Sequence, residues 1–147
     1  MSTFQKIVPF IWIANVGHEA ADYYVDLFPD AKIVDSNPTV ITIELFGQQY
    51  SILNGGPHHP LNDAVSFMVK CKDQAEVDYY WDRIIADGGT ESRCGWLHDK
   101  YEVRWQIIPD GLVECITHPD QEKARKATEV MFTQSKIILA DILAAVQ

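Results

Sequence analysis

The stretch GGTESRCGWLHDKYEVRWQIIPDG, residues 88–111, decides the fold because its last part repeats an earlier segment of the chain. WQIIPD at residues 105–110 has nearly the same order of aromatic, polar and aliphatic residues as YSILNG at residues 50–55. Ser51 and Gln106 therefore occupy equivalent positions, 55 residues apart (106 − 51). A repeat of this length indicates two copies of one supersecondary unit.

The repeat extends back to the beginning of each copy. Phe10 matches Phe67 at an offset of 57 residues (67 − 10), and the Asp-Tyr-Tyr triplet at 22–24 matches the one at 78–80 at an offset of 56 (78 − 22). Each copy begins with a β-branched and aromatic strand, continues with an amphipathic helix and ends with three short strands. The predicted strands cover residues 7–14, 31–35, 39–46, 49–53, 64–71, 90–94, 102–108 and 112–116, and the predicted helices cover residues 17–28 and 73–87.

The second predicted helix has signals at both ends. Asp73 with Glu76 three residues later is a capping-box pattern with aspartate as the cap, and Gly88 with Gly89 is typical of a helix end.

This order predicts an α+β protein whose residues 1–119 form one domain of two βαβββ modules, at about residues 7–56 and 64–117. We expect the modules to form a curled mixed sheet. Residues 120–147 are predicted to be a helical C-terminal extension with an apolar stripe, which must pack on this chain or on a partner. The stripe consists of Ala124, Ala127, Met131, Ile138, Ile142 and Leu143.

Composition limits the classes of partner. The chain has 147 residues, 47% of them hydrophobic, with a formal net charge of −9 and a pI near 4.8. A field of this sign repels phosphate backbones and anionic membranes, so we expect no nucleic-acid partner and no membrane partner. No stretch is long and apolar enough to predict a membrane span. Cys71, Cys94 and Cys115 form no close pair, which favours reduced thiols in a cytoplasmic protein.

At the level of its motifs the chain resembles the vicinal oxygen chelate superfamily, which includes glyoxalase I, extradiol dioxygenases and bleomycin-resistance proteins. Within it the chain is similar to the PhnB-like branch, whose domain is often described as 3-demethylubiquinone 3-methyltransferase. The motifs that carry the resemblance are AADYY (20–24), LFPD (27–30), FGQQ (46–49), CGWLHDKY (94–101), VRWQIIP (103–109), HPD (118–120) and EKA (122–124).

The resemblance implies that each sheet curls into a half-barrel, with helices outside and a ligand cavity inside. Alternation along the strands then divides the side chains between the two sides. We expect the bulkier set, with Phe10, Trp12 and Phe67, to pack under the helices and the mixed set to line the cavity. The predicted cavity residues are Ile11, Ser51, Ser66, Met68, Glu102, Arg104 and Gln106.

Metal-dependent members of the superfamily carry His, Glu or Gln ligands on four strands, and the resemblance places these positions at Pro9, Ser51, Ser66 and Gln106. Only Gln106 is a suitable ligand for a divalent ion, whereas catalytic metal sites usually have three protein ligands. We therefore predict no cofactor, and the alternative is a divalent metal held with the help of Glu102 or loop histidines.

Three histidine-containing motifs suggest weaker sites. His58 and His59 are adjacent in a loop, where neighbouring side chains point apart and a solvated turn is expected. The pair at 98–99 either orients an imidazole for acid–base chemistry or forms a surface bend. The motif at 118–120 predicts a turn that ends in an aspartate helix cap.

These observations lead to a main hypothesis and two alternatives. The main one is a protein that binds a small, partly apolar molecule in the sheet cavity. The resemblance also implies a homodimer, because the superfamily commonly completes its cavity by pairing modules within or between chains. The first alternative is a metal-dependent lyase, isomerase or dioxygenase of the vicinal oxygen chelate type. The second is a methyltransferase, although the sequence has no glycine-rich strand-to-helix turn for a nucleotide-like cofactor.

Overall fold

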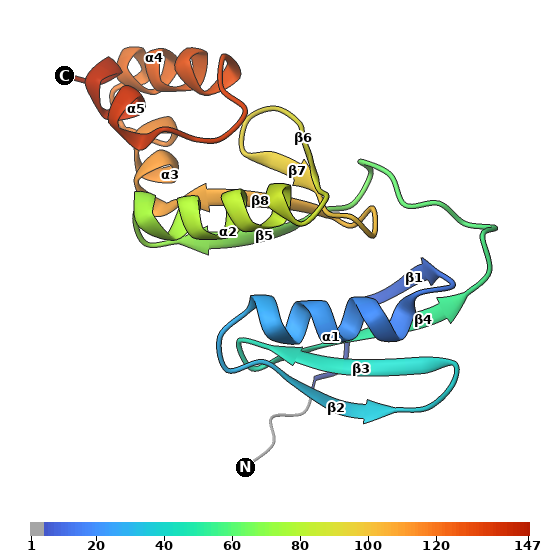
Figure 1. Ribbon diagram of the computed structural model, residues 1–147. Helices are drawn as coiled ribbons and strands as arrows, with labels where there is room; N and C mark the ends of the chain where they lie inside the picture. Colours follow the sequence, from blue (N-terminus) through green and yellow to red (C-terminus); the bar gives the residue numbers. More distant parts are fainter. Residues whose placement is uncertain (1–4) are drawn as a thin grey trace. The chain divides into compact units, whose positions relative to one another are not determined.

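The computed structural model describes residues 5–147, which divide into two compact units. The first unit ends at Leu61 and the second runs from Asn62 to Gln147. Each unit contains one helix packed on a four-stranded sheet, and the second also contains three C-terminal helices (Figure 1).

The first unit has the predicted βαβββ order. Its sheet is arranged β1-β4-β3-β2, with β1 parallel to β4 and the other neighbours antiparallel. The parallel pair requires a crossover, and the helix α1 supplies it. The elements are β1 (Phe10–Ala14), α1 (Gly17–Leu27), β2 (Lys32–Ser36), β3 (Val40–Leu45) and β4 (Gln48–Gly55).

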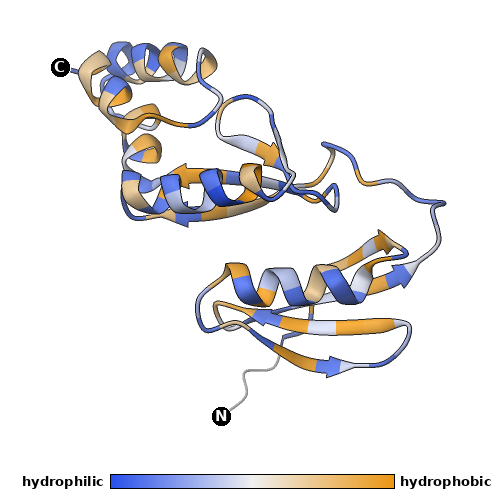
Figure 2. Ribbon diagram, viewed as in Figure 1, coloured by the Kyte–Doolittle hydropathy of each residue, from blue (hydrophilic) through white to orange (hydrophobic). Residues whose placement is uncertain are grey.

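One face of this sheet is covered by α1. The buried stripe of the helix comprises Ala20, Ala21, Tyr24 and Leu27, and it packs on an isoleucine layer of the sheet. Figure 2 shows apolar and polar residues side by side along α1 and α2, as expected for helices that bury one stripe. The isoleucine layer consists of Ile11, Ile13, Ile41, Ile43 and Ile52.

The prediction for the sides of β1 was wrong. Ile11 is 8% exposed beneath α1, whereas Phe10 is 60% exposed on the opposite side. Every residue of this strand is apolar, so alternation separates two sets without showing which one is buried. Ile11 and Ile13, which are smaller than the aromatic residues, pack under the helix, and Trp12 lies on the same side of the strand as Phe10. We call the side of each sheet that faces away from its helix the open face.

The second unit repeats this topology, with strands ordered β5-β8-β7-β6 and β5 parallel to β8. Asp73 caps α2 as predicted, accepting a hydrogen bond from the backbone N–H of Glu76. The elements are β5 (Phe67–Cys71), α2 (Gln74–Ala86), β6 (Thr90–Glu91), β7 (Trp96–His98), β8 (Arg104–Pro109), α3 (Asp110–Ile116), α4 (Gln121–Phe132) and α5 (Leu139–Ala145).

Two predicted elements of this unit are corrected. Residues 112–116, predicted as a strand, form the helix α3, because Leu112 and Cys115 lie on one helical face that is buried against the C-terminal helices. The third strand of the sheet is instead β7, which lies between the predicted strands at residues 90–94 and 102–108. Gly95 at φ 84° makes the turn that precedes it.

The C-terminal helices belong to the second unit and share a core with the end of β8. The segment between α4 and α5, residues 133–138, is fixed to the rest of the unit by backbone and side-chain contacts. The backbone N–H groups of Cys94 and Gly95 donate to Gln134 O and Ser135 O, both at 2.8 Å. The core of this region is Ile108, Leu112, Cys115, Ala127, Ile137 and Ile142.

Gln74 at the start of α2 also holds this segment. Its Nε2 donates to Ile137 O at 2.9 Å, and its Oε1 accepts from the backbone N–H of Leu139 at 2.7 Å. Lys136 forms ion pairs with Asp78 at 2.6 Å and Asp82 at 3.2 Å. The extension thus packs on this chain. Asp120 caps α4 as predicted, accepting from two backbone N–H groups. No helix within residues 5–147 has the length and apolar character needed to cross a membrane.

Candidate functional site

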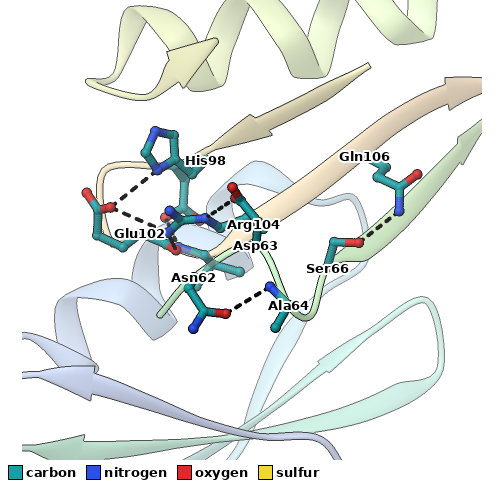
Figure 3. A network of polar contacts seen from close by, with 10 residues as sticks. Asn62, Asp63, Ala64, Ser66, His98, Glu102, Arg104 and Gln106 are labelled. Carbon is teal, nitrogen blue, oxygen red and sulfur yellow. Dashed lines mark hydrogen bonds and ion pairs between the residues drawn. The ribbon is translucent and has the colours of Figure 1, made fainter. Parts of the chain in front are cut away.

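The open face of the second unit carries most of the predicted cavity residues (Figure 3). The strand register arranges them in rows across the sheet. Met68, Gln106 and Trp96 form one row, because Gln106 pairs with both of the others. Arg104 and His98 form the next row on the same face, since they are two residues away along each strand.

The first row combines an exposed apolar side chain with a hydrogen-bonded polar pair. Met68 is 49% exposed in the edge strand β5. Gln106 Nε2 donates to Ser66 Oγ at 2.8 Å, which joins β8 to the residue just before β5 (Figure 3). Ser66, Met68 and Gln106 are therefore neighbours on this face.

Arg104 is the centre of a charged cluster. Its Nε donates to Asp63 Oδ1 at 2.8 Å, and its Nη1 donates to the backbone carbonyl of Glu102 at 2.7 Å. The Glu102 carboxylate lies 3.5 Å from Nη1. The Arg104 side chain is only 14% exposed, whereas those of Asp63 and Glu102 are 78% and 61% exposed.

His98 extends this cluster on β7. Its Nδ1 lies 3.2 Å from Glu102 Oε2, a distance suited to an ion pair when the imidazole is protonated. The contact lacks hydrogen-bond geometry, so within residues 5–147 this buried nitrogen has no hydrogen-bond partner. The sequence suggests His98 only as part of a His-Asp motif, because its position beside Arg104 depends on the unpredicted strand β7.

Asp99 builds the loop that positions the cluster. It is 2% exposed, and its Oδ1 accepts from the backbone N–H groups of Tyr101 (2.8 Å) and Val103 (3.1 Å). Its Oδ2 accepts from Trp105 Nε1 at 2.8 Å. The prediction of a surface bend at residues 98–99 was therefore wrong. These hydrogen bonds direct the Asp99 carboxylate toward its own loop and Trp105 rather than toward an imidazole. The loop places Glu102 at φ 73°, with its carbonyl toward Arg104.

The open face of the first unit has a related arrangement. Phe10 pairs in register with Ser51, which is 7% exposed and shares a 2.9 Å hydrogen bond with Thr42. Phe10 beside Ser51 therefore corresponds to Met68 beside Gln106, so the first strands of the two copies align one residue away from the predicted Phe10–Phe67 match.

Trp12 lies next to this row and contacts the loop after β4. Its Nε1 donates to Gly56 O at 2.7 Å, and its ring packs edge-on against His59 at 4.6 Å between centroids. Residues 58–59 lie in an exposed turn, as predicted, and His59 also contacts an aromatic ring. Sequence reasoning missed Trp12 and His59 as open-face residues because it assigned the tryptophan to the helix side.

The structure therefore distributes the predicted cavity residues as follows. Ile11 is in the core beneath α1, which excludes it from an open face. Ser51 lies on the open face of the first unit. The open face of the second unit and its adjoining loop hold Ser66, Met68, Glu102, Arg104 and Gln106.

The residues that the resemblance places at the superfamily's metal positions do not fit a usual metal centre. Ser51 and Ser66 are poor ligands at neutral pH, and Pro9 has no side-chain donor. Ser66 Oγ and Gln106 Nε2 also bond to each other. Within residues 5–147, no three His, Cys, Asp or Glu side chains come together in a group that could hold a metal ion.

The buried thiols do not have the properties of nucleophiles. Burial raises the pKa of Cys71 to about 12, with a smaller contribution from nearby carboxylates, and burial also raises the pKa of Cys115. A thiol is nucleophilic as the thiolate, so these two groups are inert at neutral pH.

Two βαβββ units, each with a helix on one face of a mixed sheet and an open face opposite, define a protein of the vicinal oxygen chelate superfamily. A family model described as 3-demethylubiquinone-9 3-methyltransferase matches residues 5–108. The chain belongs to this family, the PhnB-like branch of the superfamily. The matched range ends at Ile108, so α3, α4 and α5 lie outside it. Among curated proteins, none matches the chain.

Solved structures agree with this assignment. A putative 3-demethylubiquinone-9 3-methyltransferase, PhnB protein, from Bacillus cereus has 26% identity and a TM-score of 0.64, covering 71% of this chain and 99% of its own. The manganese(II) and sulfate complex of the fosfomycin resistance protein FosX from Listeria monocytogenes has 12% identity and a TM-score of 0.54, covering 74% and 90%. A glyoxalase-related enzyme from Fulvimarina pelagi has 17% identity and a TM-score of 0.53, covering 71% and 88%. The last two show a shared fold.

Proposed function

We propose that this protein binds a small, partly apolar molecule on the open face of its second unit. The observation that carries the proposal is Met68, which is 49% exposed on the strand and adjoins the Ser66–Gln106 pair. Single exposed apolar residues are common, but one beside oriented polar groups is the composition of a ligand site. A ligand that covers Met68 gains the free energy of removing its apolar surface from water.

The polar pair defines the hydrogen bonds available to such a ligand. Because Gln106 Nε2 donates to Ser66 Oγ, the serine hydroxyl keeps a hydrogen to donate and the Gln106 carbonyl oxygen can accept. A ligand with one acceptor and one donor near its apolar part satisfies both groups.

The first unit supports the same function. Phe10, 60% exposed, takes the place of Met68, and Ser51 takes the place of Gln106. Ser51 bonds to Thr42 on β3, whereas Gln106 bonds to Ser66 just before β5. Two copies of one fold therefore keep an exposed apolar residue beside a hydrogen-bonded polar residue at equivalent positions.

The experiment uses protein labelled with ¹³C at its methionine methyl groups, which gives three signals for Met1, Met68 and Met131. Benzyl alcohol serves as a neutral, partly apolar probe. We expect the Met68 signal to shift with a dissociation constant of about 1 mM, the range expected for a fragment of this size. The Met131 signal, from the C-terminal helices, should stay constant.

Met68→Gln should abolish the binding measured by calorimetric titration. Leu143→Gln is the matched control, because Leu143 is 44% exposed on α5, away from the sheet, and its replacement should leave binding unchanged. Benzyl alcohol titrated to saturation without any shift at Met68 contradicts the proposal.

We also propose that the protein is a cytoplasmic homodimer. The three cysteines are free thiols, which suits a reducing compartment. Light scattering across a range of concentrations tests the dimer, and a monomer mass at every concentration refutes it.

A metal-dependent lyase, isomerase or dioxygenase is the alternative function. The Listeria FosX structure contains manganese(II), which favours this alternative, whereas the serine and proline residues at the superfamily's metal positions disfavour it. Native mass spectrometry after incubation with zinc, nickel, manganese or ferrous iron decides between them. One ion per chain, lost in Gln106→Ala, would establish the alternative.

The family description suggests a methyltransferase as a further alternative. The β1–α1 and β5–α2 connections contain Asn15-Val16 and Lys72-Asp73, without the glycine-rich turn that cradles a nucleotide-like cofactor. Calorimetric titration with S-adenosylmethionine should show no binding, and tight binding would favour the methyltransferase.

A further inference from the structure

We infer that Arg104 recognises a carboxylate group of the bound molecule, which replaces the Asp63 carboxylate. The inference rests on the proposed function, because it assigns a chemical class to the molecule that binds beside Met68. The class is a small organic acid with a planar apolar part.

The first reason is the contrast between the two partners of the Arg104–Asp63 ion pair. The arginine side chain is 14% exposed, whereas the aspartate side chain is 78% exposed in the segment that precedes β5. An ion pair with one solvated partner contributes little to stability. An incoming carboxylate can therefore replace Asp63 at small cost, while the guanidinium keeps its place.

The second reason is that the orientation of the guanidinium does not depend on Asp63. Nη1 donates to the Glu102 carbonyl at 2.7 Å, and this carbonyl belongs to the loop that the buried Asp99 carboxylate holds. The edge of the guanidinium that carries Nε is the one that contacts Asp63 at 2.8 Å. A guanidinium edge matches the geometry of a carboxylate, so a ligand carboxylate meets a preorganised partner there.

The third reason is the spacing between the charge and the apolar surface. Arg104 and Gln106 are two residues apart on one face of β8, a separation of about 7 Å along the strand. Gln106 is in register with Met68. An aromatic acid the size of benzoate can therefore place its ring over Met68 while its carboxylate reaches Arg104.

The test compares benzoate with benzamide, which has the same shape without the charge. Binding is followed by the Met68 methyl signal and by the ¹⁵N signal of Arg104 Nε at low salt. We expect benzoate to bind about tenfold more tightly than benzamide, as for a charge-assisted hydrogen bond. Only benzoate should shift the Arg104 signal.

Variants test whether the ligand carboxylate competes with the Asp63 carboxylate for Arg104. Asp63→Asn removes the internal competitor and should tighten benzoate binding by about threefold or more, with benzamide binding unchanged. Arg104→Gln should abolish the preference for benzoate, and Arg104→Lys should keep only part of it because an ammonium lacks the planar fork. Asp87→Asn is the matched control, since Asp87 pairs with Arg83 at 3.6 Å in the same unit and should leave both affinities unchanged.

The outcomes are distinguishable. Equal binding of benzoate and benzamide at Met68 overturns the carboxylate inference and leaves the proposed function standing. No shift of Met68 with either compound overturns both. If inorganic phosphate shifts the Arg104 signal as strongly as benzoate does, the aromatic ring adds nothing to binding. That result overturns the assignment to organic acids. Asp63→Asn without effect on benzoate binding overturns the role of Asp63.

Discussion

Replacement of Asp99 should destabilise the second unit strongly, because this buried carboxylate is the acceptor for three buried donors. Asp99→Ala leaves the N–H groups of Tyr101 and Val103 and the indole N–H of Trp105 without their acceptor. An unsatisfied buried donor costs about 1–3 kcal/mol, and the loss of the carboxylate returns part of this by removing a buried charge. We expect the free energy of unfolding to fall by roughly 3–5 kcal/mol.

The amide variant gives a sharper test of the same geometry. Asp99→Asn can still accept from the two backbone N–H groups, but its NH₂ then faces the indole N–H of Trp105, donor against donor. We expect a loss of about 1–3 kcal/mol. Trp105→Phe removes the indole N–H, so it should cost less in the Asp99→Asn background than in the wild type. The double-mutant cycle should give a coupling of about 1 kcal/mol.

Urea unfolding measures the stability change, and amide hydrogen exchange at Tyr101 and Val103 locates it in the loop. Faster exchange at these two amides should accompany the stability loss in Asp99→Ala. Asp87→Asn, an exposed carboxylate in the same unit, is the control and should change stability by less than about 0.5 kcal/mol. A loss below about 1 kcal/mol for Asp99→Ala, or an additive cycle, would refute this account of the loop.

Three further predictions concern other parts of the chain. Gly55→Ala should lower stability by about 1–3 kcal/mol in thermal unfolding, because its Cβ would lie 2.5 Å from the Trp12 ring. Gly56→Ala should cost less, because only the flexible His58 side chain lies close to that position, and equal effects of the two substitutions would contradict this account. Burial raises the pKa of Cys71 to about 12, so this thiol should resist iodoacetamide in the native protein at about pH 8, whereas the half-buried Cys94 should react. Mass spectrometry of the modified peptides measures both reactions, and faster modification of Cys71 would contradict the prediction. Hydrogen bonds from Lys136 and, to a smaller extent, Gln74 hold the pKa of Asp78 below its ordinary 3.8. The stability that these bonds contribute to the folded state is complete above that pH and is lost as the pH falls through the lower, folded-state pKa. Hydrogen exchange at Leu139 should therefore accelerate in strong acid, and Asp78→Asn should remove this pH dependence.

The repeat and the helix signals predicted the architecture because they depend on local chemistry. An aspartate cap followed by an apolar stripe specifies α2 without reference to the rest of the chain. The equivalence of Ser51 and Gln106 likewise placed both at related points of two sheets.

The wrong predictions concern features that depend on contacts between residues far apart in the sequence. Residues 112–116 are helical because their apolar face meets Ile137 and Ile142, which no local pattern shows. In β1 both sets of alternate residues are apolar, so the buried side depends on the space under α1. For the site, alternation correctly put Arg104 and Gln106 on one face of β8, but Asp63 and His98 reach Arg104 from separate segments.

The attachment of residues 133–138 to α2 and to the turn before β7 has a consequence for the order of folding. All strands of the first unit are complete by Gly55, so this unit can form while most of the chain is still being synthesised. The second unit needs Ile137 and Ile142 to complete its core, and these residues are synthesised after the rest of that core. During synthesis the nascent second unit therefore exposes Ile108 and Leu112 until α5 emerges, which makes it the unit more exposed to chaperones and to aggregation.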